Sequence, residues 1–343
     1  VGKNGPVPLI DEAYTVTQIS YDAASDSYTV SVSAFGENEI FRGVKRIVGD
    51  FGDGNDSFVM FGPTGAATFG SSTIDVVDED GNTVTVPIPA ASIPGRGSDI
   101  PVEIRGGSGN DVLHYFGDAI AELYGDGGAD ELIGGSNDDI LEGGSGNDRI
   151  DGRLGTDTMK GDGGDDEIFG SPFELAGETI DGGSGDGDVL YLVGGGSDDD
   201  VTVRVSGSNI VLDTGDGTST WTTTLTSIED LQFYLGDGAD DITLVGDLSL
   251  GGLDDLVVAI SDYTTGATSP DTVTMQLTTA ADAVTLTKGS APQLAPIDRP
   301  GVTPGASTGT PPTDDTTTAS WTYDVTINGR SEQGTTGFAS DED

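Results

Sequence analysis

Apolar residues recur at a fixed interval in the middle of the chain. From Gly125 to Phe169 the sequence divides without gaps into five nonapeptides, and the eighth position of each is apolar. These position-8 residues are Leu132, Leu141, Ile150, Met159 and Ile168. One such repeat cannot bury its apolar side chain alone, so the units must stack as in a solenoid. We therefore predict very short β-strands at positions 7 to 9, with the position-8 side chain pointing into a core.

Glycine and aspartate keep the same register as the apolar residues. Position 1 is always glycine, and position 4 is glycine in four of the five repeats, with Asn137 as the exception. Glycines at positions 1, 2 and 4 are expected to turn the backbone through positive φ and to bring carbonyl oxygens inward. Position 6 always adds a carboxylate, from Asp130, Asp139, Asp148, Asp157 and Asp166. Calcium accepts roughly 6–8 hard oxygen ligands on flexible loops, so the turns are predicted to bind several Ca²⁺ ions.

These residues resemble the repeats-in-toxin (RTX) family, whose GGxGxDxUx nonapeptides form a parallel β-roll. The resemblance implies that each coil uses two nonapeptides, one loop at each edge, and that calcium lies between the loops of successive coils. It places Asp130, Asp148 and Asp166 along one edge and Asp139 and Asp157 along the other.

Further acidic residues could extend these edges. The segment from Gly106 to His114 fits the repeat, whereas the segment from Gly182 to Tyr191 fits only with one inserted residue, which leaves Asp186 and Asp188 as alternatives. Aspartate replaces the second glycine of two tandem repeats, and isolated copies occur earlier and later in the chain. For the isolated copies a plain turn at a coil corner is the alternative to a calcium site. The additional candidate ligands are Asp111, Asp126, Asp162, Asp188, Asp56 and Asp240.

The rest of the chain also reads as β-structure, since apolar and polar residues alternate in short runs and no helical stripe is convincing. We predict an all-β fold: a parallel β-roll or β-helix solenoid with calcium-binding Gly/Asp turns, flanking β caps and an extended C-terminal strand. The expected segments are an N-terminal β cap (1–44), a degenerate solenoid region (45–100), the RTX calcium roll (101–196), a solenoid continuation (197–287), a Pro/Thr/Gly linker (288–318) and a C-terminal strand segment (319–343).

The segment 321–327 alternates large apolar residues with polar ones and ends at the turn pair Asn328-Gly329. A strand of this kind is not stable alone and must add to a sheet. It either packs against its own chain or is donated to a second copy, which would give a homopolymer.

Charge restricts the partners of this chain. The sequence holds 60 acidic and 13 basic residues among 343, for a formal net charge of −47. Self-repulsion of this size opposes folding unless cations neutralise it. Nucleic acid is excluded because no Lys/Arg cluster could bind its phosphates, and membrane insertion is not expected because no run of 18 apolar residues exists. The start Val1-Gly2-Lys3-Asn4 is neither an initiator Met nor a signal peptide, so we expect a processed form or a fragment.

Catalytic motifs are absent from the sequence. His114 is the single histidine, there is no cysteine and no HExxH motif, and the GxSxG match at 305–309 lies in the Pro/Thr/Gly-rich stretch rather than at a strand-to-helix turn, so it is no nucleophile elbow. We therefore expect a non-enzymatic, secreted or extracellular calcium-dependent structural protein, such as a subunit of a surface layer, matrix or filament, or an adhesin segment. Two alternatives stay open: a non-catalytic RTX module of a secreted enzyme or toxin, and a calcium-dependent β-helical polysaccharide lyase or epimerase. For the latter, the basic residues Arg149, Arg153, Lys160 and Arg204 are scattered along the sequence.

Overall fold

The computed structural model describes residues 11–62, 99–175, 177–194, 198–215, 220–235 and 239–246, together with the backbone of six further strands. Its regular structure is entirely β, which confirms the predicted all-β class for the described residues. No helix in this part of the chain is long and apolar enough to cross a membrane. The chain forms two compact units. The first comprises Val1–Ile168 and Gly182–Asp186, and the second comprises Phe169–Asp181 and Gly187–Asp343.

The first unit contains strands β1 to β14, and β15 and β16 lie across the boundary between the units. Their bounds are β1 Ala13–Asp22, β2 Ser27–Ala34, β3 Glu37–Val44, β4 Ile47–Asp53, β5 Ser57–Phe61, β6 Thr73–Val77, β7 Thr83–Pro87, β8 Val102–Ser108, β9 Val112–Phe116, β10 Ala121–Gly127, β11 Glu131–Ile133, β12 Ile140–Ser145, β13 Arg149–Asp151, β14 Thr158–Gly163, β15 Glu167–Gly170 and β16 Thr179–Ser184.

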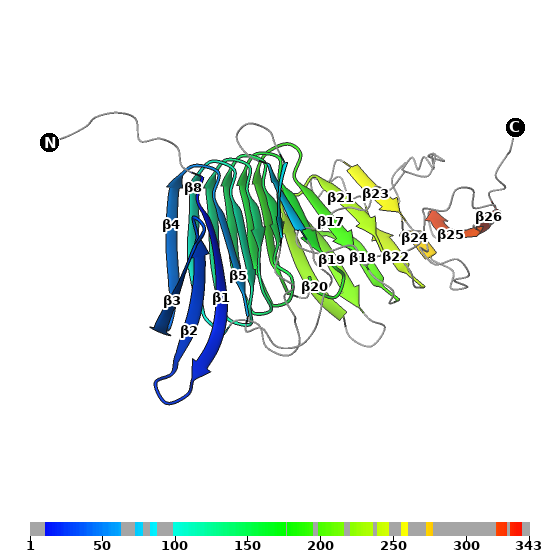
Figure 1. The fold of residues 1–343 in the computed structure, drawn as a ribbon. Helices are drawn as coiled ribbons and strands as arrows, with labels where there is room; N and C mark the ends of the chain where they lie inside the picture. Colours follow the sequence, from blue (N-terminus) through cyan, green and yellow to red (C-terminus); the bar gives the residue numbers. More distant parts are fainter. Residues whose placement is uncertain are drawn as a thin grey trace, which may run out of the picture. The chain divides into compact units, whose positions relative to one another are not determined.

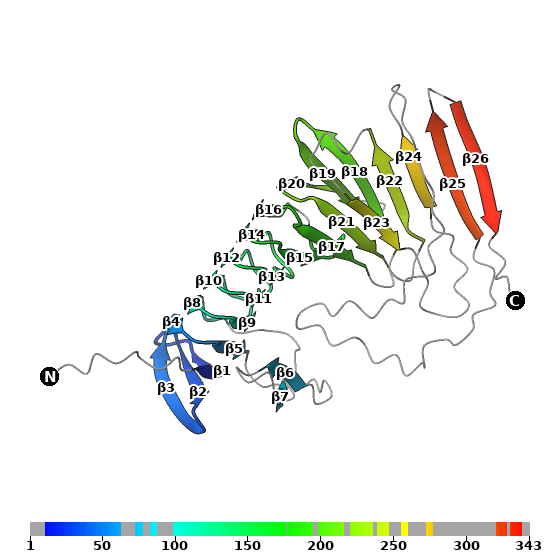
Figure 2. The ribbon, with the colours of Figure 1, turned by 90° about the horizontal axis from the view of Figure 1, so that it is seen from above.

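Two parallel stacks of strands face each other in the first unit (Figures 1 and 2). One stack runs β4-β8-β10-β12-β14 and the other runs β5-β9-β11-β13. Residues of successive coils lie in register, as in the pairs Leu141↔Met159 and Leu132↔Ile150. The position-8 side chains are at most 1% exposed, which confirms that they form the core between the stacks. Each fully buried aliphatic side chain of this size contributes roughly 1.5–3 kcal/mol through removal of apolar surface from water.

The two stacks differ in strand length. Strands β11 and β13 are three residues long and occupy positions 7 to 9, as predicted. Strands β12 and β14 are six residues long and continue through positions 1 to 3 of the following nonapeptide. The three-residue prediction was therefore too short for this stack, because the glycine positions there still pair with neighbouring coils, as Gly144 does with Asp126 and Asp162.

At the N-terminal end of the first unit the sheet becomes antiparallel. Strand β1 pairs in parallel with β5, then antiparallel with β2, and β2 pairs antiparallel with β3. Val16 and Val30 are buried on the face that continues the core. This arrangement is compatible with the predicted N-terminal cap, whose capping role stays a prediction.

The second unit contains ten strands in its described part. Their bounds are β17 Val189–Val193, β18 Asp200–Ser206, β19 Asn209–Gly215, β20 Thr220–Thr226, β21 Asp230–Tyr234, β22 Asp241–Val245, β23 Asp255–Ala259, β24 Thr272–Gln276, β25 Ser320–Ile327 and β26 Arg330–Gly337. Strands β17, β21 and β23 pair in parallel, as do β18, β22 and β24.

Strands β18, β19 and β20 instead form an antiparallel meander, which the expectation of a continuing parallel solenoid did not include. The short turn at Gly207, with φ of +71°, returns the chain directly, and only antiparallel strands can be joined by so short a turn. Arg204 and Asp213 clamp the hairpin through two hydrogen bonds, of 2.6 and 3.1 Å.

The predicted C-terminal strand is present as β25. It pairs in parallel with β24 and antiparallel with β26, both of the same chain, so the sequence analysis missed the second strand of this hairpin. The predicted linker 288–318 lies outside the described residues.

The stacked core predicts that truncation at position 8 is costly. Ile150→Ala should lower the free energy of unfolding by about 2–5 kcal/mol, because it leaves a cavity between close-packed coils. Leu154→Ala is the matched control, since Leu154 is 44% exposed, and should change stability by less than about 0.5 kcal/mol. Urea unfolding in calcium-containing buffer measures both. Equal effects would contradict the assignment of position 8 to the core.

Candidate calcium sites

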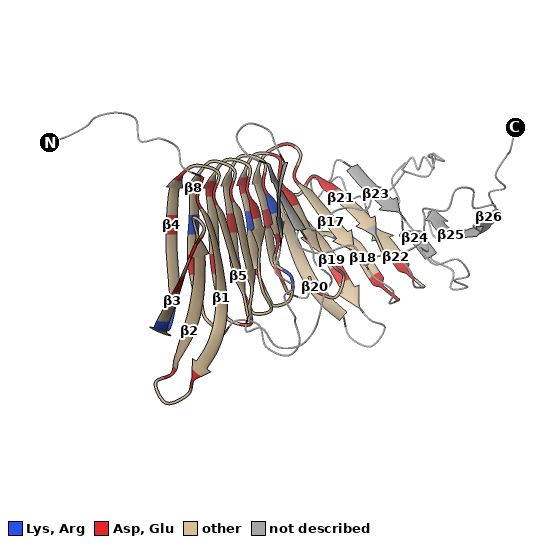
Figure 3. Ribbon diagram, viewed as in Figure 1, with Lys and Arg blue, Asp and Glu red and all other residues tan. Residues whose placement is uncertain are grey.

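The position-6 aspartates form two rows at the turns of the first unit. Figure 3 shows acidic residues gathered where strands meet turns along the stacks. One row contains Asp56, Asp111, Asp130, Asp148 and Asp166, and the other contains Asp139 and Asp157. All seven are at most 2% exposed. The structure thus places these aspartates in two rows, one along each of the two edges that the sequence suggested.

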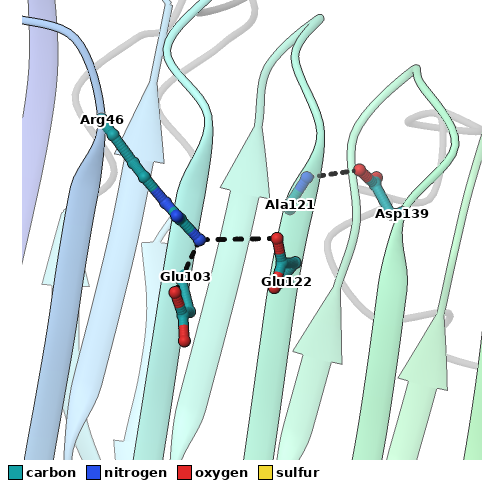
Figure 4. Close-up of polar contacts among 5 residues, drawn as sticks. All are labelled: Arg46, Glu103, Ala121, Glu122 and Asp139. Carbon is teal, nitrogen blue, oxygen red and sulfur yellow. Dashed lines mark hydrogen bonds and ion pairs between the residues drawn. The ribbon is translucent and has the colours of Figure 1, made fainter.

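Each carboxylate binds the backbone of the preceding coil through one oxygen. The amide N–H of Asp111 donates to Oδ1 of Asp130 at 2.7 Å, and the amide of Asp130 donates to Oδ1 of Asp148 at 2.8 Å. The second row repeats the pattern: the amide of Ala121 donates to Oδ1 of Asp139 at 2.7 Å (Figure 4), and the amide of Asp139 donates to Asp157 at 2.7 Å. These hydrogen bonds tie coil to coil at every turn.

The second oxygen of these carboxylates is the candidate ligand. In the first row, Oδ2 is buried and has no hydrogen-bond partner in Asp56, Asp111, Asp130 and Asp148. Asp139 differs, because its Oδ2 accepts a hydrogen bond from the amide of Gly135 at 2.6 Å. A buried, unsatisfied carboxylate oxygen costs free energy unless a proton or a cation neutralises it. The row therefore fits a cation better than it fits an empty turn.

No single turn brings three carboxylates together. Within the described residues, no group of three or more Asp, Glu or His side chains could hold a metal ion without other ligands. A calcium ion here must take most of its oxygens from backbone carbonyls, which is usual for loop sites with one carboxylate per loop.

Glycine is required at position 1 for a steric reason that the sequence analysis missed. Among the described repeats these glycines do not have positive φ, whereas positive φ occurs at positions 2 and 4, as in Gly144 (+109°) and Gly146 (+126°). A Cβ atom at Gly125 or Gly143 would lie within 3.0 Å of the Oδ2 atom of the position-6 aspartate in the same repeat. Position 1 is therefore glycine because the carboxylate packs directly against its Cα. The prediction of positive φ there was wrong.

The repeat that begins at Gly134 departs from its neighbours. Neither Gly135 nor Asn137 has positive φ, although an asparagine could adopt it. Instead, Oδ1 of Asn137 accepts a hydrogen bond from the next backbone amide, that of Asp138, at 2.9 Å. Its Nδ2 donates to the carbonyl of Asp118 at 3.3 Å.

The position-2 aspartates lie differently from those at position 6. Asp126 and Asp162 are exposed and have φ values of +69° and +71°. Oδ1 of Asp126 lies 3.5 Å from a guanidinium nitrogen of Arg105. Their use as additional calcium ligands stays a prediction.

In the irregular repeat from Gly182 to Tyr191, the two alternative ligands differ in burial. Asp188 is 1% exposed, whereas Asp186, in the first unit, is exposed. Asp188 donates its backbone amide to Glu229 at 3.1 Å, as position-6 residues do to the next coil. Asp240 is fully buried, and its Oδ1 accepts a hydrogen bond from the amide of Asp199 at 3.0 Å.

Asp199 is a candidate ligand that the sequence analysis missed. It is buried, and its Oδ2 atom has no hydrogen-bond partner among the described residues. The signal was present, because Gly194, Asp199 and Val201 occupy positions 1, 6 and 8 of a repeat. A Cβ atom on Gly194 would lie 2.5 Å from Oδ2 of Asp199, as at the tandem repeats.

A second ladder, at position 5, was also missed. The amide of Asn110 donates to Oδ1 of Asn55 at 2.8 Å, and the amide of Ala129 donates to Oδ1 of Asn110 at 2.8 Å. These bonds run from a later coil to an earlier one, opposite to the bonds at position 6. Recurrent Asn or Asp before the position-6 aspartate was the signal for it.

Burial changes the acidity of the position-6 carboxyls. It raises the pKa of Asp130 and Asp157 to about 8 and that of Asp139 to about 7, and backbone hydrogen bonds only partly oppose this effect. Burial likewise raises the pKa of Asp111, Asp148, Asp166 and Asp199 to about 6. Without a cation, these groups hold protons at a pH where ordinary aspartates are ionised.

Comparison with known proteins agrees with this geometry. The family model of the RTX calcium-binding nonapeptide repeat matches four copies, within residues 103–115, 124–159 and 142–172. The chain therefore carries the calcium-binding repeats of the RTX family, as the resemblance implied, in the block that holds all the aspartates of the two rows except Asp56. No curated protein and no solved structure matches the chain.

The packing of carboxylate against glycine predicts a position-specific effect of alanine. Gly161→Ala should weaken calcium binding by tenfold or more and lower the melting temperature in calcium, because the added Cβ would displace the carboxylate of Asp166. Gly163→Ala, two residues away, is the control, since its Cβ would meet only the Ser184 hydroxyl at 3.3 Å and a carbonyl at 3.5 Å. Calcium titration calorimetry separates the two. A Gly161→Ala chain with unchanged affinity would contradict the assignment.

The raised pKa values predict how pH acts on the calcium-free protein. Carboxyls whose pKa is raised by folding bind protons more tightly in the folded state than in the unfolded state. Ionisation of these buried carboxyls therefore destabilises the fold; this effect is absent below pH of about 4 and complete above about 8. When a chelator has removed calcium, the free energy of unfolding should therefore fall as pH rises through this range. Calcium binding at pH 6.5 should release protons, which calorimetry in buffers of different ionisation enthalpy measures. Binding without proton release would contradict the burial of these groups.

Proposed function

We propose that this chain is an extracellular structural protein that calcium folds and makes rigid, as a subunit of a surface layer, matrix or filament or as an adhesin segment. The observation that carries the proposal is that the buried Oδ2 atoms of Asp56, Asp111, Asp130 and Asp148 have no hydrogen-bond partner among the described residues. A stack built in this way is incomplete until cations bind at its turns.

Linkage between binding and folding supports an extracellular setting. Extracellular calcium modules bind at roughly 10⁻⁴–10⁻³ M. A ligand that binds only the folded state stabilises it in proportion to the logarithm of its concentration. With a net charge of −47, the chain should remain unfolded where calcium is scarce and fold where calcium is millimolar. Proteins with these repeats are typically secreted, which agrees with this behaviour.

The engagement of the basic residues favours a non-enzymatic role. Arg149 pairs with Glu167 at 2.8 Å, Lys160 with Glu142 at 2.6 Å, and Arg204 with Asp213. His114 is buried, and its Nε2 lies 2.7 Å from Glu131. Each of these pairs connects neighbouring strands, which favours a structural role for these residues over a lyase or epimerase reaction.

Assembly distinguishes this proposal from a module of a secreted enzyme or toxin. We expect chelator-treated protein to gain β-sheet circular dichroism as calcium is added and then to form species larger than a monomer in sedimentation velocity. Asp148→Asn should raise the calcium concentration needed for folding several-fold, because it keeps the size of the side chain but removes its charge. Asp50→Asn, an exposed residue of β4 with the same charge change, is the control. Magnesium should not substitute, since it demands a stricter octahedron.

Each result has a defined consequence. If a chelator left the melting curve unchanged, the proposal that the fold depends on calcium would be wrong. A stable monomer in saturating calcium would favour the module alternative over the structural subunit.

A further inference from the structure

One turn after the tandem repeats holds leucine where the turns before it hold aspartate. Counted on from the last nonapeptide, Gly170 occupies position 1 and Leu175 occupies position 6. Leu175 is 1% exposed, so it is as buried as the position-6 aspartates of the first unit. A Cβ atom on Gly170 would lie within 3.0 Å of Cγ and Cδ2 of Leu175, whereas a Cβ atom on Gly152 would meet Oδ2 of Asp157. The leucine side chain therefore fills the space that a carboxylate fills in the other turns.

The backbone of the 170–175 turn also differs from that of the repeats. Positive φ occurs at positions 2 and 4 in most repeats of the first unit, but neither Ser171 nor Phe173 has it here. Instead, the carbonyl of Ser171 accepts hydrogen bonds from the amides of Glu174 and Leu175, at 3.0 and 3.1 Å. The second of these bonds closes one turn of helix, in which carbonyl oxygens point along the axis and do not converge on a centre.

The carbonyl oxygen of Leu175 is satisfied by protein groups as well. The hydroxyl of Thr223 in β20 donates a hydrogen bond to it, and the amide of Glu178 donates at 3.5 Å. Thr223 is 1% exposed and directly precedes Thr224, which pairs with Thr179 at the start of β16. A neutral hydroxyl thus links this turn to the neighbouring strand, where the repeats use a buried carboxylate.

Two acidic residues, Glu174 and Glu178, remain close to the turn in the sequence. Glu178 is the better placed of the two, since it is 5% exposed and directly precedes β16. Calcium requires roughly 6–8 oxygen ligands. One carboxylate beside carbonyls that already accept hydrogen bonds supplies too few of them, so the turn does not fit the ion that fits the aspartate rows.

The antiparallel meander supplies apolar packing next to this turn. β20 pairs in parallel with β16 and antiparallel with β19, and Figure 2 shows β18, β19 and β20 side by side. The ring of Phe173 in the turn meets the ring of Trp221 in β20 edge to face, with 5.9 Å between their centroids. The meander buries Val203, Ile210, Leu212 and Leu225, all at most 2% exposed. None of these contacts needs a cation.

We propose that the Gly170–Leu175 turn binds no calcium and closes its coil by apolar packing instead, so that this turn and strands β18 to β20 stay folded when calcium is removed. The inference rests on the proposed function, because it contrasts this element with turns whose folding needs calcium. Leu175 is then the residue that decides which turn does without the ion.

Hydrogen exchange of the full chain, with calcium and with a chelator, tests this inference. In chelator, backbone amides of the 170–175 turn and of strands β18 to β20 should exchange at least tenfold more slowly than in the urea-unfolded chain, because their apolar packing persists. Amides of strands β10 to β13, which adjoin turns with buried aspartates, should exchange at the rate of the unfolded chain.

Substitutions at Leu175 give a sharper test. Leu175→Asp introduces the usual residue of position 6, yet it should remove the protection of the turn in chelator, because it buries a charge against Gly170. Calcium should not restore the protection, because the carbonyls of Ser171 and Leu175 already accept hydrogen bonds. Leu175→Met conserves volume and should keep the protection. Leu154→Asp makes the same change at a side chain that is 44% exposed, and should leave it unchanged.

The outcomes separate this inference from the proposed function. Protection that chelator abolishes everywhere, the 170–175 turn included, would overturn the inference and leave the calcium-dependent fold in place. Protection that chelator leaves intact everywhere would remove the proposed function; selective loss in Leu175→Asp would then still support the inference, and no loss would overturn it. Calcium that restored the protection of Leu175→Asp would show that this turn holds an ion, and the inference would be wrong.

Discussion

The first unit depends on buried carboxylates at the turns between coils. Each position-6 aspartate of the two rows accepts a hydrogen bond through one oxygen from a backbone amide of the coil before it, at 2.6–2.8 Å, and this holds adjacent turns in register. The geometry that makes this bond also buries the second oxygen. A parallel stack of short strands with little apolar side chain per coil thus obtains its register from polar contacts, and the same contacts create the demand for a cation. Under the proposed function, folding and calcium binding are therefore coupled through these contacts.

That dependence explains the distribution of glycine. Position 4 is glycine because successive turns approach too closely for a side chain: a Cβ on Gly128 would meet the carbonyl oxygen of Gly109 well inside van der Waals contact. Position 1 is glycine because the carboxylate occupies the space that a side chain would need. The sequence pattern therefore records two different steric constraints, both of which are set by the distance between coils.

Much of this could be predicted from the sequence, because the period of nine places glycine, aspartate and apolar residues in fixed relation. The apolar core at position 8 and the two rows of aspartates follow from that period. The period does not predict the structure of segments where the nonapeptide repeat is interrupted. The antiparallel β18–β20 meander arises from a tight turn at Gly207, and Asp199 lies in a single copy with serine at position 4, so neither stands out from periodicity. Position 5 was overlooked because Asn and Asp there look like ordinary polar turn residues until the coils are stacked.

The two side-chain ladders run in opposite directions along the stack, with position 5 bonding toward earlier coils and position 6 toward later ones. Each coil with a position-6 aspartate therefore presents a backbone donor to the following coil and a carboxylate acceptor to the preceding one, whereas the position-5 ladder is interrupted at Ala129, which has no side-chain acceptor. Removing or duplicating a unit of 18 residues, the spacing of Asp130, Asp148 and Asp166, would again place a position-6 aspartate opposite the backbone amide of the adjoining coil. The number of coils in such a block can therefore change while this row of carboxylates stays continuous.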